Sequence, residues 1–171
     1  MKTFERLGNR STFIGPSPVG HGAYDLTQLL GPSAPVIHGD ELWFYYTGIK
    51  YRTRPENVEQ NAGAVCLAVL RRDGFVSLDA GETDGMLVTK PFRLAATDFF
   101  VNVDATNGGS LQILLLDKLG QPMAVSGPIT GDSCRAPVLW ERGDLSNLLG
   151  QTVQVQFRLR KAQLYSFWFD K

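Results

Sequence analysis

The sequence contains almost no helical periodicity. No stretch keeps apolar residues at positions i, i+3, i+4 and i+7, and 18 glycines and 9 prolines interrupt the long runs. The chain therefore reads as mainly β. One exception is expected at residues 143–151, where Asp144 would cap one or two helical turns and Gly150 would end them.

The chain also lacks an excess of charge and a long apolar run. Seventeen basic and seventeen acidic side chains cancel to a formal net charge of zero, which removes the electrostatic footprint of proteins that bind nucleic acid or anionic membranes. No run approaches the roughly 20 apolar residues that span a bilayer, and no signal-peptide core follows the first residues. We expect a soluble chain without nucleic-acid or membrane partners and without an export signal.

Cysteine and histidine are equally scarce. Cys66 and Cys134 lie far apart, each in or beside an apolar run, so either two buried free thiols or one disulfide fits the sequence. His21 and His38 have no cysteine or histidine neighbour at ligand spacing. Neither residue type therefore marks a nucleophile or a metal site.

What the sequence does contain is a series of short strand patterns. Examples are the aromatic run at 41–48, the apolar run at 62–72 and the strict alternation at 153–159, where Val153, Val155, Phe157 and Leu159 would face the core. Residues 99–117 read as a hairpin turning at Asn107-Gly108-Gly109. Many short strands are typical of a sandwich or a barrel.

A compositional boundary divides the chain. Residues 1–40 are rich in Gly, Pro, Ser and His, and 50–61 form a charged loop, whereas alternation is regular from residue 75 onward. We place one domain at 1–72 and a β-sandwich domain at 73–171. The expected core of the second domain includes Phe75, Leu78, Leu87, Val101, Val103, Leu111, Ile113, Leu115, Val138, Val153, Val155, Phe157 and Leu159.

Several strings in order carry a family resemblance. They are GDELWFYYTG, GAVCLAVLRRDGFVSLDAGE, LVTKPF, FVNVDA and AQLYSFWF, and together they resemble the carboxy-terminal end of bacterial proteins similar to five-bladed β-propeller glycoside hydrolases. The resemblance implies that residues 1–72 are strands of a terminal propeller blade and that residues 73–171 form an appended, jelly-roll-like antiparallel β-sandwich. It also implies a non-catalytic accessory or carbohydrate-binding module, because the carboxylates of the earlier blades have no counterpart here.

A second hypothesis is a minimal glycoside hydrolase. Such an enzyme needs two carboxyl groups about 5 to 10 Å apart, and Asp25 and Glu41 of the amino-terminal segment are candidates, assembled in an oligomer. A lone blade also leaves its faces open to water. We therefore expect residues 1–72 to pack on the sandwich, to pair with the same segment of a second copy in a homo-oligomer, or to be partly disordered.

Aromatic and basic side chains suggest where a polysaccharide or oligosaccharide would bind. Trp43, Tyr45 and Trp168 are candidates for stacking on a sugar ring, with core packing as the alternative. Arg158 and Arg160 point the same way from one strand and are candidates for an acidic sugar, with a solvated sheet face as the alternative.

One acidic turn suggests a metal. Asp79, Glu82 and Asp84 fall within the string DAGETDG and offer several oxygen ligands to a structural Ca²⁺, although the spacing is not that of an EF-hand. A solvated turn explains the same residues. No other cofactor is expected.

Overall fold

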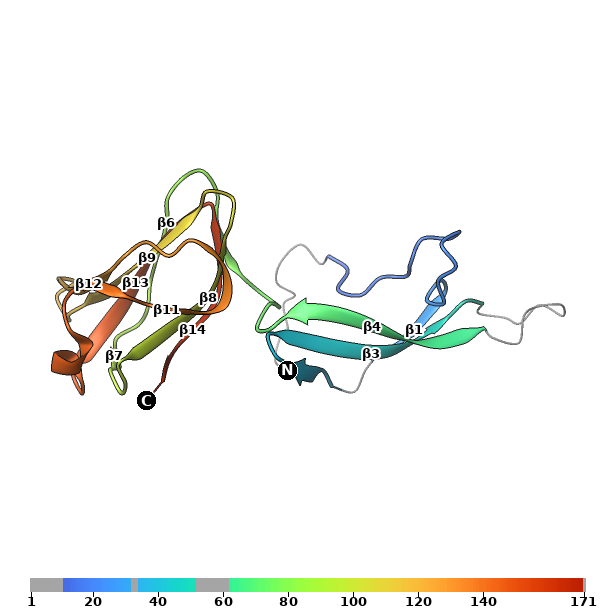
Figure 1. Cartoon of the computed structure of the whole chain (residues 1–171), viewed down its shortest axis with the longest axis horizontal. Coiled ribbons are helices and arrows are strands. Elements are labelled where there is room, and N and C mark those ends of the chain that lie inside the picture. The colour runs from blue at the N-terminus through green and yellow to red at the C-terminus, as the bar shows by residue number, and fades with distance from the viewer. Residues whose placement is uncertain (1–10, 32–33, 52–61, 171) are drawn as a thin grey trace, which may run out of the picture. The chain divides into compact units, whose positions relative to one another are not determined.

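A computed structural model describes residues 11–31, 34–51 and 62–170 of the chain (Figure 1). The chain divides into two compact units, Met1–Leu70 and Arg71–Lys171, called here the first and second units. Every strand pairing with a register in the described residues is antiparallel, and one short 3₁₀ helix is the only helix there. The prediction of an all-β chain is confirmed.

The first unit is built around strand β3 (Glu41–Ile49). Strand β1 (Gln28–Leu30) pairs with the end of β3, and β2 (Val36–His38) pairs with its beginning. Strand β4 (Gly63–Arg71) also pairs with β3. Aromatic and β-branched residues favour extended backbone, which accounts for the strand formed by the run at 41–48.

The described residues cover one face of this sheet. Leu42, Phe44 and Tyr46 alternate along β3 and are buried. The segment before β1 lies over them, because the ring of Phe13 meets Phe44 edge-on at 5.3 Å and Asp25 accepts a hydrogen bond from Tyr46 at 2.7 Å. The side chains that point the other way are exposed or half-buried.

The second unit consists of two antiparallel sheets that share one core (Figure 1). The larger sheet runs in the order β12 (Trp140–Arg142), β10 (Pro122–Ser126), β9 (Ser110–Leu116), β13 (Thr152–Arg160) and β6 (Gly85–Val88), with β7 (Phe92–Arg93) also on β13. The smaller sheet runs β11 (Gly131–Pro137), β8 (Asp98–Ala105), β14 (Ala162–Asp170) and β5 (Leu78–Ala80). The arrangement is that of a β-sandwich.

The core lies between these sheets. The alternating side chains of β13, from Val153 to Leu159, are buried as predicted, and Phe157 at their centre is fully buried. The expectation that Phe75 and Leu78 belong to the core is wrong, since both are more than half exposed. Phe75 precedes the strands of the second unit, and Leu78 begins β5, the edge strand of the smaller sheet, so both lie at the margin of the core.

The chain turns at Asn107-Gly108, but not as a hairpin. Strands β8 and β9 flank the turn as expected, with Gly108 at φ +69°, yet they belong to different sheets. Both strands carry apolar side chains that need a facing sheet, and crossing from one sheet to the other buries both sets. The turn therefore forms a corner of the sandwich.

Two other local features bear on the sequence predictions. The 3₁₀ helix η1 (Leu145–Leu148) begins at Asp144, whose carboxylate accepts from the backbone N–H of Ser146, and Gly150 has a positive φ, as expected. Both cysteines are free, which excludes a disulfide between them. In the described ranges, no helix is long and apolar enough to cross a membrane.

Candidate functional site

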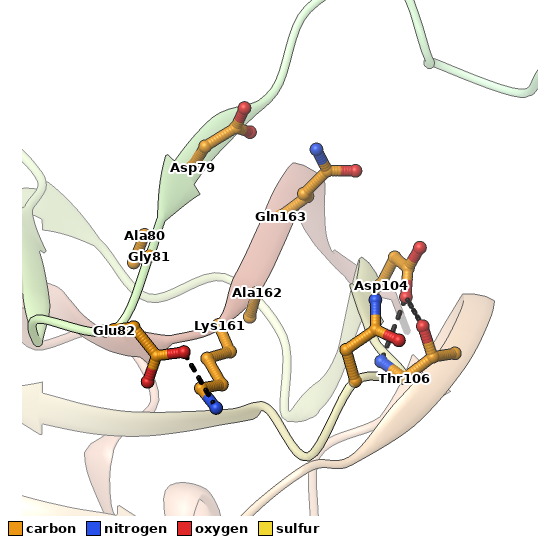
Figure 2. A pocket seen from close by; sticks show the side chains of 10 residues that line it. Asp79, Ala80, Gly81, Glu82, Asp104, Thr106, Lys161, Ala162 and Gln163 are labelled. Carbon is orange, nitrogen blue, oxygen red and sulfur yellow. Dashed lines mark hydrogen bonds and ion pairs between the residues drawn. The ribbon is translucent and has the colours of Figure 1, made fainter.

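A polar cavity of about 480 Å³ lies at one end of the smaller sheet (Figure 2). The volume is in the range of small-molecule sites, roughly 300 to 1,000 Å³. Its polar lining comes from strand β5 and the turn after it, the end of β8 with the corner that follows, and the start of β14. The lining residues are Asp79, Ala80, Gly81, Glu82, Asp104, Thr106, Asn107, Lys161, Ala162 and Gln163.

Strand register places three of these side chains in one row. Gln163 on β14 is directly opposite Asp79 on β5 and directly opposite Asp104 on β8. Residues that face each other across antiparallel strands point to the same side of the sheet. The row therefore lies on the outer face, because the neighbouring Ala162 and Leu164 are buried in the core.

Three loops close the rest of the cavity. The backbone N–H of Lys161 donates to the carbonyl of Gly81 at 2.8 Å, and the Lys161 ammonium pairs with Glu82 at 2.9 Å (Figure 2). Lys161 has φ +47°, so it makes the tight turn between β13 and β14. Gly109 packs against this turn so closely that a Cβ there would lie 2.1 Å from the Lys161 carbonyl oxygen.

Hydrogen bonds determine the charge of Asp104 and the orientation of the Gln163 amide. The hydroxyl and the backbone N–H of Thr106 donate to Asp104 at 2.8 and 3.0 Å, which lowers the pKa of that carboxyl, with the Arg71 charge adding to the effect. The hydroxyl of Tyr165 donates to Gln163 Oε1 at 2.7 Å, and burial raises the pKa of Tyr165. Asp104 is thus a carboxylate at neutral pH, and the neutral Tyr165 hydroxyl orients the Gln163 amide.

The side chains of the cavity include both hydrogen-bond acceptors and hydrogen-bond donors. Carboxylate oxygens of Asp79, Glu82 and Asp104 accept hydrogen bonds, while the amide of Gln163 and the ammonium of Lys161 donate. A ligand rich in hydroxyl groups can both donate and accept, and matches this mixture. No protein-family model, curated protein or solved structure matches the chain.

The acidic turn predicted as a Ca²⁺ site is only partly gathered here. Asp79 and Glu82 line the cavity, whereas Asp84 lies 4.0 Å from Arg160. Glu82 pairs with Lys161. Among the described residues, no three or more His, Cys, Asp or Glu side chains come together as a metal site, so the Ca²⁺ stays a prediction.

Trp168 lies elsewhere on the outer face of the smaller sheet. It is directly opposite Phe100, and the two rings stack with centroids 5.8 Å apart. The guanidinium of Arg135 sits 4.2 Å from the Phe100 centroid and 5.7 Å from that of Trp168, and it pairs with Asp170 at 3.0 Å. An arginine thus covers the aromatic pair that a sugar ring would need to contact.

The alternation expected around Trp168 is interrupted by a bulge. Leu164 pairs with Val103 and Ser166 with Asn102, so Tyr165 is an extra residue between them. The bulge shifts the phase, and Leu164 points inward while Ser166 and Trp168 point outward. A strict alternation along β14 would instead put these three side chains on one face.

The two predicted arginines belong to the other sheet. Arg158 and Arg160 are exposed on β13, where they are directly opposite Gln112 and Ser110 of β9. Arg160 has Asp84 as a partner. Because β13 and β14 lie in different sheets of the sandwich, these arginines and Trp168 point outward from opposite sides and do not form one site.

Trp43 and Tyr45 belong to the first unit. Trp43 stacks on His38 with centroids 4.1 Å apart, and its indole N–H donates to Glu41 at 2.7 Å. Tyr45 meets Trp43 edge-on at 6.2 Å and is nearly half exposed. Both aromatics therefore lie on the uncovered face of β3 and not in a closed core.

Asp25 and Glu41 are placed too far apart to act as a hydrolytic pair within one chain. A Cβ on Gly48 would lie 2.7 Å from that of Asp25, so Asp25 sits beside the end of β3, whereas Glu41 is its first residue. Seven residues of strand span roughly 23 Å, against about 5 to 10 Å for acid and nucleophile or base. The two residues also lie on opposite faces, because Asp25 contacts Tyr46 and Glu41 contacts Trp43.

Asp25 instead forms a buried hydrogen bond that makes the first unit sensitive to pH. The Tyr46 hydroxyl lowers the pKa of Asp25, with Ser17 helping, and Asp25 raises the pKa of Tyr46 to about 12. The lowered value contributes stability above the ordinary carboxyl pKa, which is lost as pH falls through the folded value. The raised value contributes stability below pH 10, which is lost as pH rises through about 12.

We expect Tyr46→Phe to reduce the loss of stability at both acid and alkaline pH. The variant should also lower the melting temperature of the first unit by about 5 °C at neutral pH. Denaturation followed by the NMR signals of residues 41–49 between pH 2 and 12 measures the effect. Tyr45→Phe removes an exposed hydroxyl one position away and serves as the control. Equal profiles for the two variants would contradict the structural role of the Asp25–Tyr46 bond.

Most of the residues that line the cavity could not be predicted from the sequence. Gln163, Asp104 and Lys161 are unremarkable polar residues, and only their register across β5, β14 and β8 brings them together. The Asn107-Gly108 turn signal was visible, and a corner there is a natural place for a site. The other loops that line the cavity lie about 25 and 55 positions away in the sequence, and no local pattern predicts that they meet this corner.

Proposed function

We propose that this chain is a non-catalytic carbohydrate-binding module and that the polar cavity of the second unit holds the sugar. The observation that carries the proposal is the cross-strand row Asp79–Gln163–Asp104. Planar carboxylate and amide groups fixed on neighbouring strands suit the recognition of vicinal hydroxyl groups. The resemblance of several sequence strings to the end of propeller glycoside hydrolases supports a polysaccharide as the source of that sugar.

The charge of the cavity restricts the class of sugar that it can bind. Three carboxylates face one ammonium group, which is already paired with Glu82. An acidic sugar would meet like charges there, which is unfavourable. Neutral sugars are therefore the expected ligands.

Catalysis is not part of the proposal. A glycosidase keeps one carboxyl group protonated by raising its pKa, whereas the pKa of Asp104 is lowered and Glu82 is paired with a lysine. Asp25 and Glu41 serve as hydrogen-bond partners of Tyr46 and Trp43. A module of this kind would accompany a catalytic partner or tether it to polysaccharide.

Affinity electrophoresis in gels that contain neutral polysaccharides tests the proposal. We expect the wild-type protein to be retarded by at least one polysaccharide and the variant Asp79→Ala/Gln163→Ala to lose at least tenfold in affinity, because each lost hydrogen bond costs about 1 kcal/mol. Asp98→Ala, an exposed carboxylate on the same sheet outside the cavity, is the matched control.

Three outcomes bear on the proposal. Retardation that is lost in the double variant and kept in the control supports binding at the cavity. If the double variant is still retarded and Trp168→Ala is not, the sugar binds at the Phe100–Trp168 pair instead of the cavity. Hydrolysis of the polysaccharide by the wild-type protein contradicts a non-catalytic role.

A further inference from the structure

The first unit has one face that nothing in the described residues covers. It is called here the open face and consists of alternate positions on β3 and β4 with one residue each from β1 and β2. Its apolar members are more than two-fifths exposed, apart from Trp43, which is half-buried under His38. They are Leu30, Val36, Trp43, Tyr45, Val65, Leu67 and Val69.

Strand register and side-chain contacts place these residues on one face. Val36 is directly opposite Trp43, and Leu30 is directly opposite Thr47, two positions beyond Tyr45. On β4, Ala64, Cys66 and Ala68 are half-buried, so they point to the covered face. The alternate residues Val65, Leu67 and Val69 must then point to the open face.

The middle of the open face carries no charge, and Glu41, the first residue of β3, is a charged residue at its edge. Positions 43, 45 and 47 of β3 and positions 65, 67 and 69 of β4 are Trp, Tyr, Thr, Val, Leu and Val. On a sheet face that is exposed to water, polar or charged side chains normally occupy these alternate positions. Because this middle part of the face is uncharged, a second copy placed against it meets no like-charge repulsion there.

Its size also fits a self-association surface. With the exposures given above, the apolar members offer roughly 600 Å² of accessible surface, at the upper end of the largest patch on a typical monomer and close to the ~800 Å² per partner of a standard interface. Two twisted sheets pack face to face about 10 Å apart and bury such alternating side chains between them. The first unit supplies one sheet of such a pair.

We propose that two copies of this chain dimerise by packing their open faces together around a two-fold axis. Each copy then contributes the same residues to the interface, as a two-fold axis requires. The dimer completes a sandwich from two sheets that each have one face already covered by the segment before β1. This inference is independent of sugar binding, although a dimer would present two cavities and gain avidity on a polysaccharide.

The test is the mass of the full-length protein in solution, measured by sedimentation equilibrium between about 1 and 100 μM. We expect a dimer for the wild type and a monomer for Val65→Lys, whose side chain is 75% exposed and replaceable without disturbing the covered face. Val19→Lys adds the same charge to a valine of the same unit that is 85% exposed and lies outside the sheet. This control should remain a dimer.

Two results would overturn the inference. A wild-type protein that is monomeric throughout the range excludes the second copy as the occupant of the open face. In that case, slow thiol labelling of Leu67→Cys in the monomer would assign the face to another part of the same chain. A dimer that persists unchanged in Val65→Lys would place the interface elsewhere.

Discussion

Replacing Gly109 by alanine is expected to unfold or severely destabilise the second unit, with a loss of about 3 kcal/mol or more. The added Cβ would lie 2.1 Å from the carbonyl oxygen and 2.8 Å from the carbonyl carbon of Lys161. These are backbone atoms of the tight turn between β13 and β14, so no flexible side chain can move aside. The turn that carries Lys161 into the cavity would have to shift.

Gly108 provides a matched control one residue away. Gly108 has φ +69° and no atom within 4 Å of the position of a Cβ, so alanine there costs only the strain of a left-handed backbone, about 1 kcal/mol. Thermal denaturation of both variants, followed by NMR signals of the second unit, separates close packing from backbone strain. Equal losses for the two variants would mean that the corner does not pack on the β13–β14 turn.

Phe157→Ala is expected to cost the second unit about 3 to 5 kcal/mol. The Phe157 ring is fully buried, with ring centroids of Phe167 at 4.9 Å and Phe99 at 6.4 Å. Truncation leaves a cavity between the two sheets that these neighbours cannot fill without leaving their strands. Because a small domain has only about 5 to 15 kcal/mol of stability, a large part of it would be lost.

Phe75→Ala is the comparison for this variant. Phe75 belongs to the same unit but is 58% exposed, and its truncation should cost less than about 1 kcal/mol. Urea denaturation of the two variants measures the difference in free energy of unfolding. A loss at Phe75 as large as that at Phe157 would show that the sequence-based assignment of Phe75 to the core was correct after all.

The strand content and the core of the larger sheet were predictable from the sequence. On β13 the apolar residues recur at every second position over nine residues, and this periodicity determines which face is buried without any knowledge of the partner strands. The cap at Asp144 was predictable for a similar reason, since its interaction with Ser146 is local.

The features that were not predictable depend on partners distant in sequence. Whether β8 and β9 form a hairpin or a corner depends on the strands that flank them, β14 and β11 for one and β13 and β10 for the other. The bulge at Tyr165 depends on the register against β8. A one-residue shift of this kind inverts every later side chain, and no pattern within residues 162–170 indicates it.

The candidate site was predictable only in part. Asp79 and Glu82 were predicted as oxygen ligands of a Ca²⁺ ion, and both line the cavity. The aromatic and basic candidates were chosen by residue type, and the fold distributes Trp43, Trp168 and Arg158 over separate surfaces. Residue type identifies side chains able to bind a sugar, but only topology decides which of them act together.

The central claim is that the cavity at the end of the smaller sheet binds a neutral sugar. The most direct test is a titration of the isotopically labelled full-length protein with neutral oligosaccharides, followed by backbone and side-chain amide NMR signals. We predict shifts concentrated at Gly81, Thr106, Asn107, Lys161 and the side-chain amide of Gln163, with little change along β13. Shifts that avoid these residues, or a spectrum unchanged by every oligosaccharide tested, would contradict the claim.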